Sequence, residues 1–193
     1  LGHLRVAEEV RDRLGLDRVL FIPTAVQPLK KERNVAGTDD RLKMIRLAIR
    51  GNRFFRASDV EAKRGGISYS IDTVKSYARR FDDLYFLIGV DAFSEMNLWK
   101  DYRDLFRYTN FAVMVRPNHR VEDLLEVLPR DISREVQRID ASTYEHTSGK
   151  RLFLLEITQL DISSTTIRSL VKEERSIRYL VSDPVARFIY QRG

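Results

Sequence analysis

Short apolar, β-rich runs alternate along this chain with stretches of helical spacing, and no other feature limits the possible folds as much. The strand-forming runs cover residues 19–23, 54–60, 84–89, 111–115 and 152–157. Alternation of this kind is typical of a parallel sheet with helices on both faces. The runs at 84–89 and 111–115 are almost continuously apolar, so we expect them to form central strands. The sequence therefore predicts an α/β fold.

The helices are predicted from apolar residues that recur three or four positions apart. Such spacing is found over residues 4–14, 42–49 and 71–78. Asp39 or Asp40 is expected to cap the second of these helices. We also expect a helical insertion over residues 121–139, broken at Pro129 because proline interrupts a helix.

The C-terminal part, from about residue 160 to 193, is expected to be helical. Ser163 or Ser164 should cap a helix that reaches Lys172, and Asp183 should open a last helix with proline at its first position.

A length of 193 residues fits one domain, so residues 1–193 are predicted to form a single domain. The chain opens directly on a helix, without Met and without the strand that begins a β-first α/β domain. We therefore expect residues that precede Leu1, including the first strand, to be missing from this sequence.

Composition excludes several classes of function. The chain has no Cys, which rules out disulfides, thiolate zinc sites, iron–sulfur clusters and a Cys nucleophile, and its three His are too scattered for a histidine metal site. Any catalytic metal must then enter with a substrate. The longest apolar runs have five or six residues, against about 20 needed to cross a bilayer. We expect a soluble, cytoplasmic protein that does not enter membranes.

The charge balance indicates an anionic partner. Lys and Arg number 34 against 28 Asp and Glu, a net charge of +6, and the two signs are interspersed. Bulk charge of this kind fits a nucleotide as well as a nucleic acid.

Two candidate binding segments lie in the N-terminal half. Gly2 and His3 fall in the first turn of a helix, where free N–H groups and the helix dipole attract phosphate. The alternative is an ordinary exposed histidine at a helix start. A loop after the first strand carries Lys30 and Lys31, which could reach a bound phosphate or form a solvated pair.

Further candidates follow the next strands. Ser70 precedes a helix, where it could bind a ligand or act as a cap. Gly89 and Asp91 come directly after a buried strand, and Asp91 suits a ribose hydroxyl or an N-cap. Trp99 offers a flat face to a base or pyridine ring, although a single Trp is more often part of a core.

The segment "DISSTTIR" is the most phosphate-like motif. It places four hydroxyls and Arg168 around a helix start, so that N–H groups, hydroxyls and a guanidinium converge on one anion. Capping by Ser163 would account for part of this pattern.

The order and spacing of these motifs resemble the bacterial nicotinate-nucleotide adenylyltransferases, of the nucleotidylyltransferase superfamily, along nearly the whole chain. The family motifs H-x-G-H, P-P-H-K, S-Y-T-x-D-T, I-G-x-D, R-P and I-S-S-T-x-I-R align with residues 1–3, 27–30, 68–73, 88–91, 116–117 and 162–168, and "SIRYLVSDPV" at 176–185 also matches. Here Leu29 replaces the family histidine and Ser70 replaces threonine. The first histidine and the glycine-rich loop would precede Leu1.

The resemblance implies a Rossmann-like parallel sheet and transfer of AMP from ATP, with Mg2+, to nicotinic acid mononucleotide. Deamido-NAD and pyrophosphate would form, in NAD biosynthesis. The implied catalytic residues are His3 and Lys30. Those implied for ATP are His3, Gly89, Asp91, Arg116, Ser164, Thr165 and Arg168, and those for the acceptor are Lys30, Ser70, Asp91 and Trp99.

Three alternatives remain open at this level. A sister adenylyltransferase could use nicotinamide mononucleotide or another phosphorylated acceptor. A basic nucleic-acid-binding protein would show clustered charge and a recognisable motif, and neither is present. The chain could also be a truncated, inactive relative. We expect no nucleic-acid partner, and a homo-oligomer stays possible.

Overall fold

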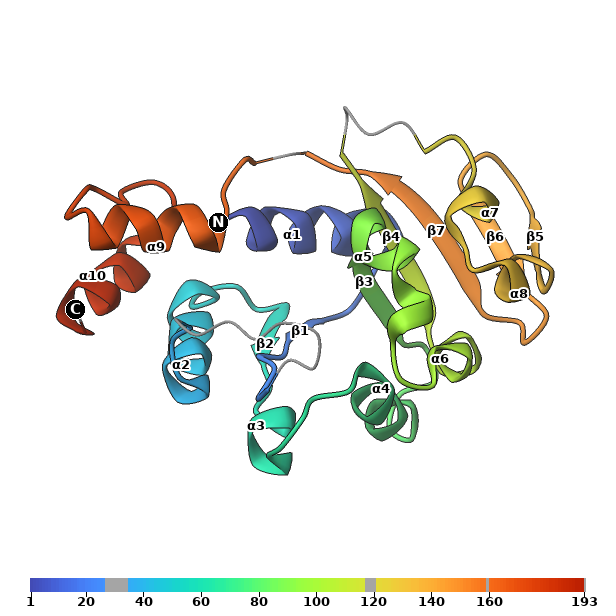
Figure 1. The fold of residues 1–193 in the computed structure, drawn as a ribbon, viewed down its shortest axis with the longest axis horizontal. Helices are drawn as coiled ribbons and strands as arrows, with labels where there is room; N and C mark the ends of the chain where they lie inside the picture. Colours follow the sequence, from blue (N-terminus) through green and yellow to red (C-terminus); the bar gives the residue numbers. More distant parts are fainter. Residues whose placement is uncertain (27–34, 117–120, 159, 193) are drawn as a thin grey trace. The chain divides into compact units, whose positions relative to one another are not determined.

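The computed structural model describes residues 1–193 except 27–34, 117–120, 159 and 193. The described chain divides into two compact units, which can be followed by colour in Figure 1. The terminal unit combines Leu1–Gly66 with Thr158–Gly193, and the central unit covers Ile67–Ile157. Both ends of the chain therefore contribute to the same unit.

The terminal unit contains a parallel pair of strands and most of the longer helices. Its elements are α1 (Gly2–Leu14), β1 (Val19–Phe21), α2 (Thr38–Ala48), β2 (Phe55–Ala57), α3 (Val60–Arg64), α9 (Ser164–Lys172) and α10 (Asp183–Arg192). Strand β1 pairs with β2 in parallel, with Val19 opposite Phe55. Helix α1 ends at Gly15, whose φ of 63° is the left-handed conformation that glycine adopts without a Cβ penalty.

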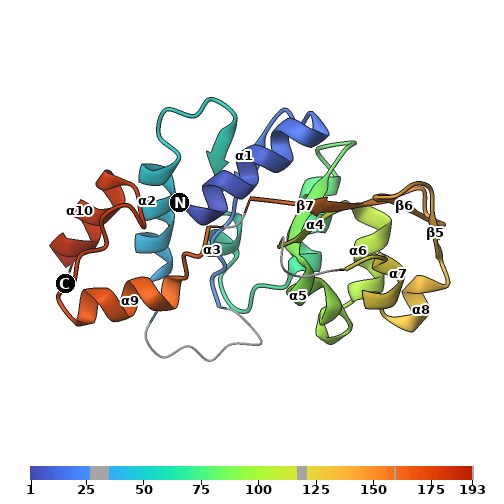
Figure 2. The same cartoon turned by 90° about the horizontal axis from the view of Figure 1, so that it is seen from above.

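Helix α10 packs beside α2, as Figure 2 shows. Arg192 Nη2 donates a hydrogen bond to Asp40 Oδ1 at 3.0 Å, and Lys43 Nζ lies 4.8 Å from the centre of the Phe188 ring. The last helix of the chain is therefore held by residues near position 40. The predicted start at Asp183 is confirmed, but Pro184 occupies the second helical position rather than the first.

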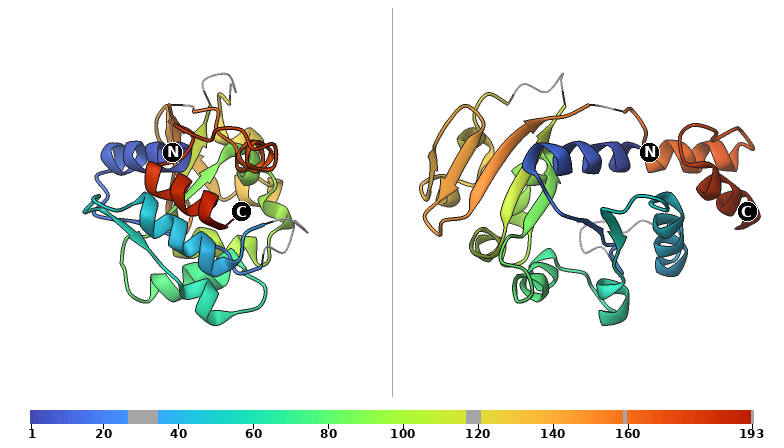
Figure 3. Two further views of the ribbon diagram at one scale, coloured as in Figure 1. Left: turned by 90° about the vertical axis from the view of Figure 1, so that its left-hand side faces the viewer. Right: turned by 180° about the vertical axis from the view of Figure 1, so that it is seen from behind.

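The central unit is organised around a five-stranded sheet. Its elements are α4 (Ser70–Ala78), β3 (Tyr85–Gly89), α5 (Val90–Ser94), the 3-10 helix η1 (Met96–Leu98), α6 (Tyr102–Tyr108), β4 (Asn110–Val115), α7 (Leu124–Val127), α8 (Arg130–Ser133), β5 (Val136–Arg138), β6 (Thr143–His146) and β7 (Arg151–Glu156). The strand order is β3-β4-β7-β6-β5. Strands β3, β4 and β7 are parallel, whereas β6 and β5 are antiparallel additions (Figure 3).

Aromatic side chains fill the core of the central unit. Phe93, Phe106 and Phe111 are fully buried, and the centres of the Phe106 and Phe111 rings lie 4.8 Å apart. Tyr144 is also fully buried, and its hydroxyl accepts a hydrogen bond from the Leu124 amide at 3.2 Å. Burial of such large side chains is worth ~2–3 kcal/mol each and fixes the sheet beneath its helices.

The α/β fold class with a parallel central sheet is confirmed, but three local predictions are wrong. The N-cap of α2 is Gly37, so Asp39 and Asp40 lie inside its first turn rather than at its cap. Strands β3 and β4 were both expected to be central. In the five-stranded sheet, β4 has a neighbouring strand on each side, but β3 is an edge strand.

The third error concerns the insertion at residues 121–139. Helices α7 and α8 have four residues each, and the chain then turns into β5. Ile132 and Val136 are four positions apart, as in a helix, but Val136 instead pairs with His146 across the antiparallel hairpin. Pairing with a distant strand therefore outweighs the local helical spacing.

Of the helices in the described ranges, none is both long enough and apolar enough to cross a bilayer.

Candidate functional site

The first turn of α1 carries His3, as predicted. The side chain is exposed, and the helix begins one residue before it, at Gly2. A Cβ atom added at Gly2 would lie 3.7 Å from the Leu160 carbonyl oxygen and 4.0 Å from that of Ile162. The beginning of α1 therefore lies next to the segment that leads into α9, which Figure 1 also shows.

The beginning of α9 has the properties of an anion-binding site. Ser163 is the N-cap, and its Oγ accepts a hydrogen bond from the Thr166 amide at 3.0 Å, so capping by Ser163 is confirmed. Ser164 and Thr165 follow it with exposed side chains. No acidic residue occupies the first turn, so the positive end of the helix dipole is not compensated there.

Arg168 belongs to the same cluster. Its Nη2 donates a hydrogen bond to Thr165 Oγ1 at 3.2 Å, which holds the guanidinium against the first turn of α9. Backbone N–H groups, hydroxyls and a guanidinium together make a site suited to phosphate. Three of the predicted ATP-binding residues, Ser164, Thr165 and Arg168, are thus neighbours in the structure.

Lys30 lies outside the described residues, but the chain on either side of it is described. Arg41 connects the two sides: its guanidinium donates to the Ala25 carbonyl at 3.3 Å and to the Ala36 carbonyl at 3.0 Å. It also donates to Thr38 Oγ1 at 3.0 Å. Arg41 could not be singled out from the sequence, because its side chain bonds to a segment 16 positions earlier and nothing in the local pattern marks that contact.

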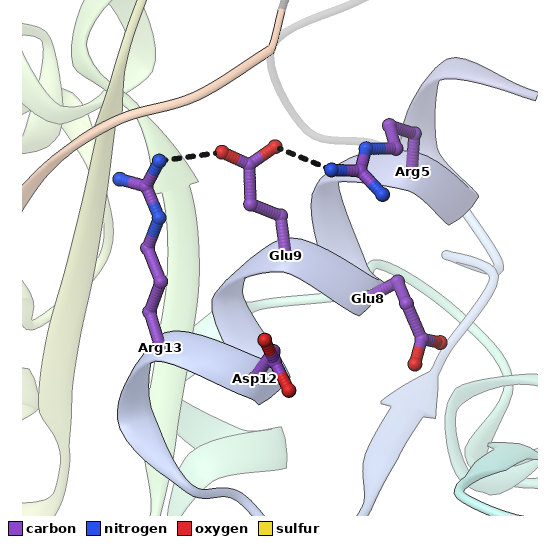
Figure 4. Close-up of a pocket in the computed structure, with 5 residues that line it drawn as sticks. All are labelled: Arg5, Glu8, Glu9, Asp12 and Arg13. Carbon is purple, nitrogen blue, oxygen red and sulfur yellow. Dashed lines mark hydrogen bonds and ion pairs between the residues drawn. The ribbon is translucent and has the colours of Figure 1, made fainter.

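A polar cavity of about 440 Å³ lies along α1 and is lined by Arg5, Glu8, Glu9, Asp12 and Arg13 (Figure 4). The nearly buried Glu9 is paired with Arg13 at 2.7 Å and with Arg5 at 3.7 Å, and it accepts a hydrogen bond from the Thr158 amide at 3.1 Å. Burial acts to raise the pKa of Glu9, but the Thr158 hydrogen bonds and the two arginines outweigh it, so the pKa is lowered overall. The carboxylate of Glu9 is therefore committed to the fold, and the cavity contains no predicted site residue.

In the central unit, Gly89, Asp91 and Arg116 lie at one edge of the sheet. Gly89 is the last residue of β3 and the N-cap of α5, which excludes the alternative that Asp91 is the cap. Asp91 is exposed in the first turn of α5. Arg116 follows β4 directly, and β3 and β4 are parallel, with Gly89 opposite Met114. The carboxyl ends of neighbouring parallel strands are where open α/β sheets bind ligands.

Ser70 and Trp99 also belong to the central unit, where Lys100, the residue after Trp99, contacts residues on either side of Ser70. Ser70 is the first residue of α4 and Tyr69 is its N-cap, so the capping alternative for Ser70 is wrong. Trp99 follows η1 and is half-buried, with its ring centre 6.0 Å from that of Phe86. Lys100 follows Trp99 in the chain. Its side chain reaches the beginning of α4, where Nζ lies 4.5 Å from the centre of the Tyr69 ring.

Among the described residues, no group of three or more His, Cys, Asp or Glu side chains is arranged to hold a metal ion. His119 lies outside these residues, His3 is exposed and His146 is buried in the central unit.

Comparison with known proteins identifies the family of the chain. The family model described as cytidylyltransferase-like matches residues 1–170. The chain belongs to the cytidylyltransferase-like family, whose members transfer nucleotides.

Relatives with curated names identify the branch of the family. A "probable nicotinate-nucleotide adenylyltransferase" of Pelobacter propionicus is 45% identical over 192 residues, which is 98% of this chain and 89% of the relative. One of Geobacter sulfurreducens is 42% identical over 192 residues, with the same coverage of both chains. Within the family, the chain thus groups with proteins named as nicotinate-nucleotide adenylyltransferases, and the resemblance seen in the sequence is confirmed.

The fold has a counterpart among solved structures. Nicotinic acid mononucleotide adenylyltransferase of Plasmodium falciparum, complexed with NaAD, superposes with a TM-score of 0.71. It covers 99% of this chain and 88% of its own, at 15% identity. This likeness supports the fold, and at that identity it does not assign individual site residues.

Proposed function

We propose that this chain transfers the adenylyl group of ATP to nicotinic acid mononucleotide, forming deamido-NAD and pyrophosphate in NAD biosynthesis. The observation that carries the proposal is the beginning of α9, where exposed hydroxyls, a helix N-terminus and Arg168 are arranged for a polyphosphate. Family membership supports the reaction type. Residues 1–193 would act as one catalytic domain in the cytoplasm, with phosphorylated small molecules as partners rather than nucleic acid.

The reaction needs no covalent enzyme intermediate. A phosphate oxygen of the mononucleotide attacks the α-phosphorus of ATP, a new P–O bond forms, and the bond from the α-phosphorus to the bridging oxygen breaks as pyrophosphate leaves. Catalysis then depends on positioning the reactants and on stabilising negative charge. ATP-using nucleotidyltransferases typically work with a divalent metal, and we propose that Mg2+ enters as part of the ATP substrate.

The site residues divide by their task. In the terminal unit, His3 would donate a hydrogen bond to the reacting phosphates, and Ser164, Thr165 and Arg168 would hold the ATP phosphates. The positive charge of Lys30 would stabilise the negative charge of the reacting phosphates of ATP and of the mononucleotide. In the central unit, Gly89, Asp91 and Arg116 would line the nucleotide site, with Asp91 toward a ribose, and Ser70 and Trp99 would bind the acceptor. The exposure of His3 and Asp91 fits groups that meet a ligand.

The test combines two acceptors in one assay. The full chain is incubated with Mg2+ and ATP plus either nicotinic acid mononucleotide or nicotinamide mononucleotide, and pyrophosphate and dinucleotide are quantified together. We expect fast turnover of the acid and slow turnover of the amide. If the protein converts neither acceptor, the proposal is overturned. If it converts the amide faster than the acid, the choice of acceptor is overturned.

A further inference from the structure

Lys100 connects two segments of the proposed acceptor site. It follows Trp99 in the chain, and its ammonium lies over the ring of Tyr69, 4.5 Å from the centre. The same ammonium is 4.0 Å from Asp72 Oδ2, in the first turn of α4. The residue that follows Trp99 thus places a cation on Tyr69 and near Asp72, which flank Ser70 in the chain; Ser70 and Trp99 are the two residues proposed to bind the pyridine mononucleotide.

The surroundings of Lys100 leave its charge available to a ligand. At 4.0 Å its contact with Asp72 is an ion pair too long for a hydrogen bond, and its side chain is 46% exposed. Lys75, in helix α4, offers a comparison. It also lies over a tyrosine ring, Tyr108 at 5.4 Å, but it donates a hydrogen bond to Asp104 at 2.8 Å. Lys75 is thus engaged with a close carboxylate partner, whereas Lys100 is not engaged so closely with Asp72.

Nicotinic acid and nicotinamide mononucleotides have nearly the same shape, so an enzyme must distinguish them by charge and hydrogen bonding. The acid has a carboxylate, which accepts hydrogen bonds, whereas the amide has an NH2 group, which donates them. An ammonium group has three donors and a positive charge, so it pairs with the charged carboxylate through either oxygen, whereas the neutral carboxamide offers it one carbonyl oxygen and an NH2 group that cannot accept. It also offsets Asp72, whose charge would otherwise repel an anionic ring substituent.

We propose that Lys100 is a specificity-determining residue, whose ammonium favours the carboxylate of nicotinic acid mononucleotide over the carboxamide of the amide substrate. The inference rests on the proposed function, because it places the pyridine ring beside Trp99. It adds a named side chain and a charge to that site.

The main experiment measures kcat/KM for both mononucleotides at saturating Mg2+ and ATP. Lys100→Met keeps the length and apolar stem that pack on Tyr69 and removes the charge. We expect the acid-to-amide ratio of kcat/KM to fall about fivefold, the effect of one charge pair at a partly exposed position, mostly through a higher KM for the acid. Lys100→Arg should keep the ratio within about twofold of the wild-type value.

Lys75→Met is the matched control, because it also removes a cation that lies over a tyrosine near an aspartate. It should leave the ratio unchanged even if it lowers the thermal stability. Two further readouts depend on charge alone. Raising the ionic strength should lower the ratio in wild type more than in Lys100→Met. Equilibrium binding of the acid mononucleotide without ATP should weaken in Lys100→Met and in Lys100→Gln. Because both variants remove the charge, the test can still be made with one of them if the other folds poorly.

The possible results separate the two proposals. If wild type converts neither mononucleotide, the proposed function itself is overturned. If wild type prefers the acid and both neutral variants keep the wild-type ratio, the inference about Lys100 is overturned while the function stands. An equal change of the ratio in Lys75→Met would also overturn the inference, since a general loss of positive charge would then explain the preference.

Discussion

His3 illustrates what a single residue contributes when its role is transition-state stabilisation. It is exposed in the first turn of α1, so its removal should leave the fold intact. We predict that His3→Ala lowers kcat by a factor corresponding to ~2–4 kcal/mol and changes the KM values comparatively little. Steady-state kinetics of folded variant protein measure this, and a wild-type kcat would remove His3 from the mechanism.

Arg168 should behave differently, because a guanidinium that holds phosphates acts on the ground state as well as on the transition state. We predict that Arg168→Ala raises the KM for ATP about tenfold and also lowers kcat. Arg175→Ala is the control: Arg175 lies three residues after the end of α9, is exposed, and pairs at 3.3 Å with Glu173. An unchanged KM for ATP in Arg168→Ala would argue against phosphate binding at the beginning of α9.

The role of a residue can be predicted from the sequence when it depends only on neighbours along the chain. Ser163 as a cap and Gly89 at a strand end both follow from their neighbours along the chain, and both are found there. The contacts of Arg41 with Ala25 and of Lys100 with Tyr69 could not be predicted in this way. Each joins segments 16 or more positions apart, and long flexible cations are compatible with many partners until the fold brings one close.

At the scale of elements, the strands and helices with strong apolar patterns were predictable, within four residues at their ends. The hairpin of β5 and β6 was not. Its sharp turn depends on Asp140, whose Oδ1 accepts hydrogen bonds from the amides of Ser142 and Thr143, each at 2.8 Å. Such side-chain turns compete with helix formation, and the spacing of apolar residues carries no trace of them.

Glu9 shows how one element is fastened to another part of its unit. It joins α1 to the Thr158 amide, so we predict that Glu9→Gln lowers the free energy of unfolding by about 1–3 kcal/mol at neutral pH. The pKa of Glu9 is lowered in the fold, so its stabilising effect is present above the ordinary glutamate pKa and is lost as the pH falls through the folded value.

Urea unfolding of wild type and Glu9→Gln at pH 7 and at pH 3.5 tests this. The difference between the two proteins should shrink in acid. Asp12→Asn, at an 82% exposed side chain of the same helix, should have almost no effect at either pH. A difference that stays constant with pH would show that the Glu9 charge does not matter.

At the scale of the whole molecule, His146 links stability to pH. The ring is nearly buried, its Nδ1 accepts a hydrogen bond from the Ser148 amide at 3.0 Å, and its Nε2 lies 3.3 Å from Glu135 Oε2. Burial lowers its pKa, against the opposing effect of Glu135; Arg107 adds to the lowering. The neutral ring is thus the form that the fold accommodates, because a proton on Nδ1 would face the Ser148 N–H group.

The unfolded chain therefore takes up this proton first as the pH falls. We predict that the free energy of unfolding decreases from pH 7.5 to pH 5.5, as the pH passes the ordinary histidine pKa of about 6.5. His146→Gln should be less stable at pH 7.5 but should lose less stability over this range. His3→Ala, which changes an exposed histidine, should keep the wild-type pH dependence. Equal pH dependence in His146→Gln and wild type would contradict the assignment.

The division of the chain into units also has a consequence for synthesis on the ribosome. All of Ile67–Ile157 leaves the exit tunnel before the last 36 residues, Thr158–Gly193, are available. Domains generally fold as they emerge, so the central unit can acquire its core while the first 66 residues still lack the partners that α10 gives to α2. Residues 1–66 are therefore made before the central unit but completed after it, and until then their apolar surface is a part of the nascent chain that a chaperone could protect.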